Sequence, residues 1–138
     1  MRFIDASVFI NAVLKPRRPL TDEERSVKER AKGVLRRVDE GERVLTTVVH
    51  LSEVANVLED VAGTLLAARF VHDLLAKENV VVEAVSAEDY LESAVLAGEK
   101  GVSVNDALAY LVMRRRGVRE IYTFDKHFEK LDVDIVKE

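Results

Sequence analysis

Acidic residues follow short apolar runs at two distant places in this chain of 138 residues. Asp5 comes directly after Phe3-Ile4, and Asp125 follows the segment 121–124. A run of this kind that ends in a carboxylate is typical of a buried strand whose C-terminal tip carries a functional group. Ligands of open α/β sheets bind beyond the carboxyl ends of the strands. Both acids are therefore candidates for chemistry, although Asp5 alone is also well explained as the N-cap of the next helix.

Two further acids lie near the starts of expected helices. Glu53 is about two turns into a helix expected over 48–61, on the flank of its apolar stripe. Asp106 falls in the first turn of a helix that is apolar on nearly every side until Arg114, which predicts a buried helix. Each acid has an alternative explanation. Glu53 alone could be a solvated helix acid, and Ser103-x-x-Asp106 is itself a capping-box pattern.

Four carboxylates at one edge of a sheet would repel one another unless a cation compensated them. A hard divalent cation with oxygen ligands, Mg²⁺ or Mn²⁺, suits this set best. The chain has no cysteine and its three histidines are widely spread, which excludes a typical zinc or soft-metal site. A bound divalent cation activates water and polarises phosphoryl oxygens, so the pattern favours phosphodiester hydrolysis.

Smaller polar groups and basic clusters accompany the acids. Ser7 and Thr123 each lie two residues from an acid, where they could orient a carboxylate or a metal-bound water, or serve only as capping and strand residues. The basic clusters that could contact RNA phosphates, or could be solvated helix ends, contain Arg17, Arg18, Arg114, Arg115 and Arg116. The net charge of −4 argues against binding nucleic acid by bulk electrostatics alone.

The elements that must position these residues alternate along the chain. Strands are expected at 3–4, 44–47, 80–85, 120–124 and 133–136, and helices at 7–14, 21–40, 48–61, 64–77, 86–100 and 103–116. This alternation predicts an α/β fold, a three-layer α/β/α sandwich with a central, mostly parallel sheet of about five strands. The length predicts one domain over residues 1–138. We expect a cytoplasmic protein, because no signal peptide or bilayer-spanning apolar run of about 20 residues is present.

Four short motifs occur in order along the chain. They are Ile4-Asp5-Ala6-Ser7, Ser52-Glu53-Val54, Asn105-Asp106-Ala107-Leu108-Ala109 and Thr123-Phe124-Asp125-Lys126-His127. Together they resemble the signatures of the PIN-domain ribonucleases, and the chain is most similar to the small VapC-type toxins of toxin-antitoxin pairs. Each motif is weak alone, but the resemblance covers essentially the whole chain.

The resemblance implies an endoribonuclease that depends on Mg²⁺ or Mn²⁺. Its metal-binding and catalytic acids would be Asp5, Glu53, Asp106 and Asp125, supported by Ser7 and Thr123. It also implies an RNA substrate, a homodimer and an antitoxin that covers the acidic cleft, often with an arginine. Many relatives have a further Asp where this chain has His127. A second metal would then be lost or held loosely, and His127 would contact the substrate phosphate or be an ordinary surface histidine.

Three other classes remain as alternatives. The fold could be an RNA-binding or assembly module without cleavage activity, although the presence of all four acids speaks against this. A phospho-receiver domain needs adjacent acids after the first strand and a late lysine, whereas Asp5 is followed by Ala6 and the late strand ends in Asp125. A haloacid-dehalogenase-like phosphatase requires a second Asp at the position of Ser7.

Overall fold

A five-stranded parallel sheet forms the centre of the computed structural model, which describes residues 1–137. The strands are β1 (Arg2–Ile4), β2 (Val44–Thr47), β3 (Val80–Glu83), β4 (Glu120–Tyr122) and β5 (Asp134–Ile135). Their order is β3-β2-β1-β4-β5, and every pairing is parallel. The first strand is therefore central, as its apolar composition predicts, and its C-terminal end opens directly at Asp5.

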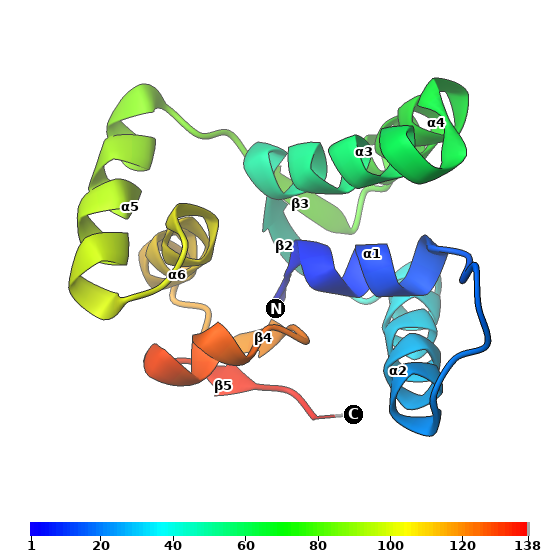
Figure 1. Cartoon of the computed structure of the whole chain (residues 1–138). Coiled ribbons are helices and arrows are strands. Elements are labelled where there is room, and N and C mark those ends of the chain that lie inside the picture. Colours follow the sequence, from blue (N-terminus) through cyan, green and yellow to red (C-terminus); the bar gives the residue numbers. More distant parts are fainter. Residues whose placement is uncertain (138) are drawn as a thin grey trace.

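Helices cover both faces of the sheet (Figure 1). One face carries α1 (Ala6–Val13), α2 (Asp22–Asp39), α3 (Val48–Ala62) and α4 (Thr64–Ala76). The other carries α5 (Ala87–Lys100), α6 (Val104–Arg116) and the 3₁₀ helix η1 (Lys126–Lys130). The predicted three-layer α/β/α sandwich is thus confirmed.

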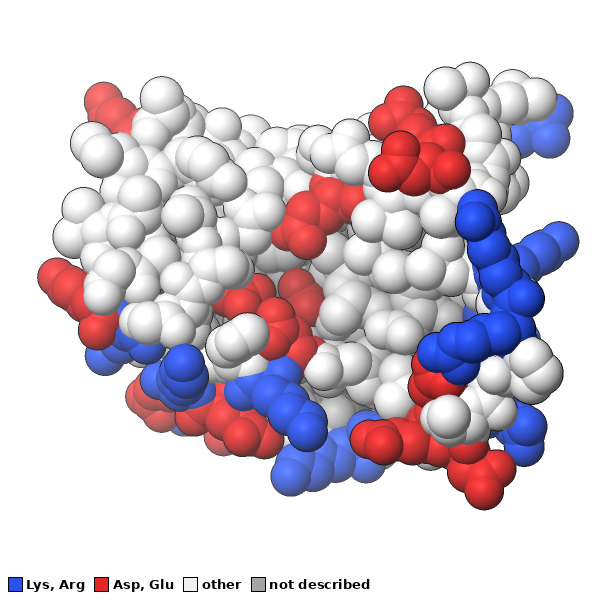
Figure 2. Space-filling view, viewed as in Figure 1, with Lys and Arg blue, Asp and Glu red and all other residues white. Residues whose placement is uncertain are grey.

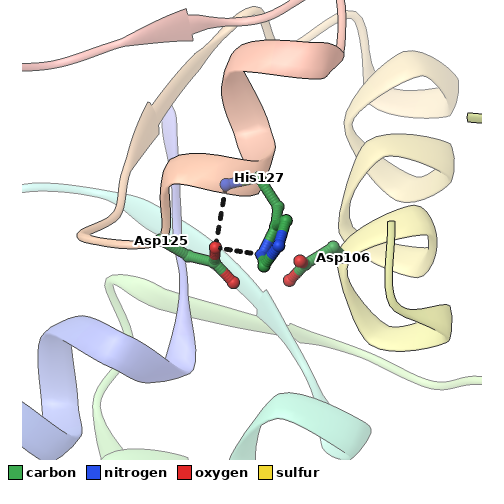
Figure 3. Close-up of side chains that lie close together, drawn as sticks. All are labelled: Asp106, Asp125 and His127. Atoms are coloured by element: carbon green, nitrogen blue, oxygen red, sulfur yellow. Dashed lines mark hydrogen bonds and ion pairs between the residues drawn. The ribbon is translucent and has the colours of Figure 1, made fainter. Parts of the chain in front are cut away.

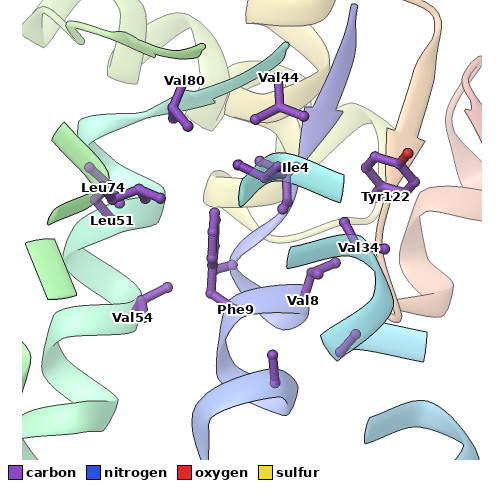
Figure 4. Close-up of a cluster of buried hydrophobic side chains, with 14 of the residues drawn as sticks. Ile4, Val8, Phe9, Val34, Val44, Leu51, Val54, Leu74, Val80 and Tyr122 are labelled. Carbon is purple, nitrogen blue, oxygen red and sulfur yellow. The ribbon is translucent and has the colours of Figure 1, made fainter. Parts of the chain in front are cut away.

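Neighbouring side chains of each central strand enter different cores, because successive residues of a strand point to opposite faces. Ile4 and Tyr122 pack with α1 to α4 (Figure 4), whereas Phe3 and Ile121 pack against α6. The predicted burial of α6 is confirmed, since seven of its residues are buried. Packing on both faces therefore fixes the ends of these strands. The residues directly after those ends are held in place by the same packing.

Three strands are shorter than the sequence pattern predicts. β3 ends at Glu83, β5 has two residues, and β4 ends at Tyr122. For β4 the cause is visible, because the backbone N–H of Phe124 donates to Ser7 Oγ at 3.1 Å and takes part in no strand ladder. The end of this strand is therefore pulled toward the start of α1.

Side-chain caps fix where helices α2 and α6 begin. A capping box begins α2, with the side chains of Thr21 and Glu24 each accepting from the other residue's backbone N–H group. Ser103 caps α6 by accepting from the backbone N–H of Asp106 at 3.0 Å, and Gly117 ends it at a φ of 66°. Among residues 1–137, no helix combines the length and apolar character needed to cross a bilayer.

Candidate metal-dependent active site

The carboxyl ends of β1 and β4 bring Asp5 and Asp125 to the same edge of the sheet. These strands are neighbours, and the backbone N–H of Asp5 donates to the carbonyl of Tyr122 at 3.0 Å. A shallow pocket of about 370 Å³ opens at this edge, lined by residues that include Glu53, Asp106 and Asp125. Figure 2 shows acidic side chains in the hollow of this face, with basic side chains along its lower and right margins.

Asp5 is buried and is held by two hydroxyl groups from different elements. Ser7 Oγ donates to Asp5 Oδ2 at 2.7 Å, and Thr123 Oγ1 donates to the same oxygen at 2.8 Å. The hydroxyls also accept from the backbone N–H groups of Phe124 and Asp125. Ser7 and Thr123 therefore join the ends of β1 and β4, and their bonds to Asp5 use Oδ2 and leave Oδ1 outside them.

Asp106, Asp125 and His127 form a compact cluster of possible metal ligands. One ligand atom of each lies within 4.8 Å of those of the other two. Asp106 directs its carboxylate from α6 toward the other two side chains (Figure 3). Asp125 Oδ1 accepts from the backbone N–H of His127 at 2.9 Å, and His127 Nδ1 lies 2.8 Å from the same oxygen. His127 is thus at the acidic site, although its ring is largely exposed.

Glu53 reaches the site from the second turn of α3. Asn105 Nδ2 donates to Glu53 Oε1 at 2.7 Å, and Tyr90 Oη donates to Asn105 Oδ1 at 2.6 Å. Tyr90 is on α5, so this short network joins three helices. The periodicity of α3 left the direction of Glu53 open, and the structure directs it into the pocket.

His50 lies beneath the acids and is completely buried. Its Nε2 lies 3.1 Å from the backbone carbonyl of Asn105 and 4.0 Å from Asp5 Oδ1, while Nδ1 lies 2.7 Å from Thr47 Oγ1. The carbonyl can only accept, so Nε2 carries the proton. Burial lowers the pKa of His50 despite the nearby charge of Asp5. His50 is therefore a neutral link between the start of α6 and the end of β2.

The acids shift one another's protonation. Burial, with the negative charges of Asp125 and Asp5, raises the pKa of Asp106 to about 7. Burial also raises the pKa of Glu53, although the bond from Asn105 opposes this. Burial would raise the pKa of Asp125 too, but several hydrogen bonds, the strongest of them from the His127 backbone, together outweigh it, so that pKa is lowered. A site that disfavours its own negative charge at neutral pH is suited to binding a cation.

One atom of the site gives a direct test of whether a cation fits. Asp106 is 6% exposed, and its buried Oδ2 has no hydrogen-bond partner within residues 1–137. A buried carboxylate oxygen without a partner is costly, and a divalent cation would satisfy it. The neighbouring donors are carboxylate oxygens and one imidazole, a set that suits Mg²⁺ or Mn²⁺. The residues present therefore fit such an ion.

The predicted basic clusters lie at helix ends away from the pocket. Arg114, Arg115 and Arg116 form the last turn of α6, about 12–15 Å along the helix from Asp106. Arg115 donates to Asp89 and Glu92, and Arg116 is paired with Glu83. Arg17 and Arg18 follow the far end of α1, where Arg18 forms two bonds to Glu24. Their predicted contacts with RNA stay a prediction.

Sequence reasoning brought out all four acids and both hydroxyl residues but assigned no role to Tyr90, Asn105 or His50. Asn105 carried a signal, because it is a polar residue in the first turn of an apolar helix. His50 carried a weaker one, since it follows Thr47 at capping distance. No feature of the sequence around Tyr90 indicates that its hydroxyl group reaches a residue 15 positions away.

Comparisons with known proteins found a matching family profile and a similar solved structure. The sequence profile of the PIN domain family matches residues 2–134. A crystal structure of Mycobacterium tuberculosis VapC20, described as a sarcin-ricin loop cleaving toxin, superposes with a TM-score of 0.73. The two sequences are 23% identical, and the match covers 97% of this chain and 99% of that chain. No curated protein matches the sequence. At this identity the structural similarity concerns the fold.

Proposed function

Because this chain belongs to the PIN domain family, we propose that it is an endoribonuclease that depends on Mg²⁺ or Mn²⁺. The single observation that carries the proposal is the buried, unpartnered Oδ2 of Asp106 beside Asp125 and His127. A divalent cation would satisfy an oxygen in that position, and a cation among carboxylates at a sheet edge suits phosphodiester hydrolysis. Asp5, Glu53, Asp106 and Asp125 are the proposed metal-binding and catalytic acids.

In this mechanism the chain's own residues mainly position oxygen atoms. Ser7 and Thr123 hold Asp5 by one oxygen, and Asn105 does the same for Glu53. The remaining oxygens of these acids would hold the cation, which would supply a lowered pKa for a bound water and compensation for negative charge on the phosphate. Because these acids are fixed before the substrate arrives, little reorganisation is needed during the reaction.

The proposed biological setting is a toxin-antitoxin pair in the cytoplasm. The negatively charged pocket would attract an arginine of an antitoxin for the same reason that it would attract a metal cation. We also propose that the chain forms a homodimer. In support, α4 exposes Leu65, Leu66 and Leu75, and large exposed apolar side chains are common at protein interfaces. VapC20 suggests one RNA to test, a hairpin with the sarcin-ricin sequence.

The test is cleavage of end-labelled RNA by the full chain. We expect cleavage of that hairpin or of a single-stranded RNA with Mg²⁺ or Mn²⁺ and none with EDTA. Asp5→Asn should reduce the rate to the EDTA level while leaving the circular dichroism spectrum unchanged. Asp60→Asn, which alters an exposed acid of α3, is the matched control and should cleave like the parent.

Two outcomes would contradict the proposal. Equal rates for the parent and Asp5→Asn would remove the catalytic assignment. Metal-independent RNA binding without cleavage would instead support the binding-module alternative.

A further inference from the structure

Asn105 lies where three parts of the acidic site meet. It precedes Asp106 in the first turn of α6, and its backbone carbonyl accepts from His50 Nε2 at 3.1 Å. Its side chain lies between Glu53 on α3 and Tyr90 on α5, with hydrogen bonds of 2.7 and 2.6 Å. Both its backbone and its side chain are thus held, and no role has been given to it in the reaction.

The two ends of the Asn105 amide are not equivalent. Glu53 as a carboxylate only accepts hydrogen bonds, so Nδ2 must face it, and Oδ1 then faces Tyr90. The hydroxyl of Tyr90 donates to Oδ1, which favours this direction of the amide. A reversed amide would place two acceptor oxygens against each other and leave the carboxylate without its donor. Hydrogen bonds in such a series also strengthen one another.

Glu53 needs this support more than the other acids do. Its side chain has one more rotatable bond than that of Asp, and Glu53 itself is only partly buried on the flank of α3. Ordering a free Glu side chain when a cation binds would cost conformational entropy. A carboxylate already held by Asn105 has lost that freedom during folding, so more of the binding energy remains for the cation.

We propose that Asn105 and Tyr90 are positioning residues, with Asn105 holding Glu53 toward the cation and Tyr90 orienting the Asn105 amide. The proposal rests on the proposed function, because it takes Glu53 to be a metal ligand. It assigns α5 a part in the site although α5 supplies no acid to it. Arg115 secures that helix against α6 by bonding Asp89, the residue before Tyr90, at 2.6 Å.

The test measures Mn²⁺ binding by the full chain without RNA, from the electron paramagnetic resonance signal of free Mn²⁺. Loss of an outer partner of a metal ligand typically weakens metal binding by about 10- to 100-fold, and we expect about tenfold for Asn105→Leu. Tyr90→Phe, which removes only the hydroxyl group, should weaken binding by about threefold, the lower end of a single hydrogen bond's effect. Tyr110→Phe removes a hydroxyl group from α6 outside the pocket lining and should leave the affinity unchanged.

A double-variant cycle separates positioning from general destabilisation. Because Tyr90 acts through Asn105, Tyr90→Phe should weaken binding no further in a chain that already carries Asn105→Leu. Saturating Mn²⁺ should restore the cleavage rate of Tyr90→Phe, so that only the Mn²⁺ concentration for half-maximal rate rises. If Asn105→Leu does not fold, Glu53→Gln takes its place in the cycle with the same expectation.

The outcomes distinguish this inference from the proposed function. A parent chain that binds no Mn²⁺ would overturn both. A parent that binds Mn²⁺ and cleaves RNA, together with an unchanged affinity for Tyr90→Phe or additive effects in the cycle, would overturn the positioning role and leave the nuclease proposal standing.

Discussion

Three of the four acids of the site are each held through one oxygen by a group of the chain itself. Ser7 and Thr123 bond Asp5 Oδ2, Asn105 bonds Glu53 Oε1, and His127 bonds Asp125 Oδ1. Asp106 differs, because its buried Oδ2 has no partner within residues 1–137. This difference fits a metal site in which the Asp106 oxygen gains its partner only when a cation binds. The other three acids are already positioned before the cation binds.

His127 gives the first prediction, which concerns the choice of cation. Imidazole is a ligand that Mn²⁺ accepts more readily than Mg²⁺ does, since Mg²⁺ favours oxygen. We expect His127→Asp to shift the cleavage activity toward Mg²⁺, with the ratio of Mn²⁺- to Mg²⁺-supported rates falling severalfold. Rates measured in each cation for the parent and for His127→Asp check this, with His72→Asp as an exposed control on α4. An unchanged ratio would remove His127 from the cation's surroundings.

The sequence predicts the four acids and the two hydroxyl residues beside Asp5, but not the support of Glu53 by Asn105 and Tyr90, for a physical reason. Asp5 and Asp125 are recognisable because parallel strands place their carboxyl ends at one edge. Glu53 is on the flank of its helix, so its direction depends on Asn105 and not on periodicity. Tyr90 reaches the site only because α5 packs on α6. Tertiary contacts of this kind produce no recognisable pattern in the local sequence.

The helices and their starts were predictable because local interactions decide them. The cap at Ser103 was visible in sequence, and Ser103 does cap α6. Strand ends were less predictable, as the early end of β4 shows. There the hydroxyl of Ser7 takes the backbone N–H of Phe124, and this hydrogen bond joins residues 117 positions apart.

The last turn of α6 gives the next prediction. Its arginines also complement the negative end of the helix dipole. If they bind RNA phosphates, replacing Arg114, Arg115 and Arg116 with Gln should weaken RNA binding and flatten its dependence on salt. The log–log slope should fall by about one unit for each phosphate that the variant no longer neutralises. Binding to the inactive Asp5→Asn chain at several salt concentrations measures this. An unchanged slope would leave the cluster as the anchor of α5, which the bonds of Arg115 already indicate.

At the scale of the whole molecule, the fold holds together carboxylates that repel one another. Two packed helical layers hold the strand ends and the start of α6 in place, so the acids cannot move apart to relieve their repulsion. Part of the folding free energy is therefore offset at the site when no cation is bound. Such local instability at functional residues is a common cost of activity.

This cost gives the last prediction, on how stability changes with pH. The raised pKa of Asp106, about 7, means that the folded chain binds a proton there between about pH 4 and 7 while the unfolded chain does not. The free energy of unfolding should therefore fall as the pH rises through that range, by at most about 4 kcal/mol from this group. Glu53 acts in the same direction. The lowered pKa of His50 acts in the opposite one, so the parent's pH dependence alone is not diagnostic.

The comparison with Asp106→Asn isolates this contribution. In EDTA this variant should unfold at higher urea than the parent at pH 8 and at about the same urea at pH 5, because Asn carries no charge at either pH. Mn²⁺ should stabilise the parent at pH 8 by mass action and should stabilise Asp106→Asn much less. Asp60→Asn should follow the parent in each condition. If the parent and Asp106→Asn lost stability equally between pH 5 and pH 8, Asp106 would titrate near its ordinary pKa and would carry no need for a cation.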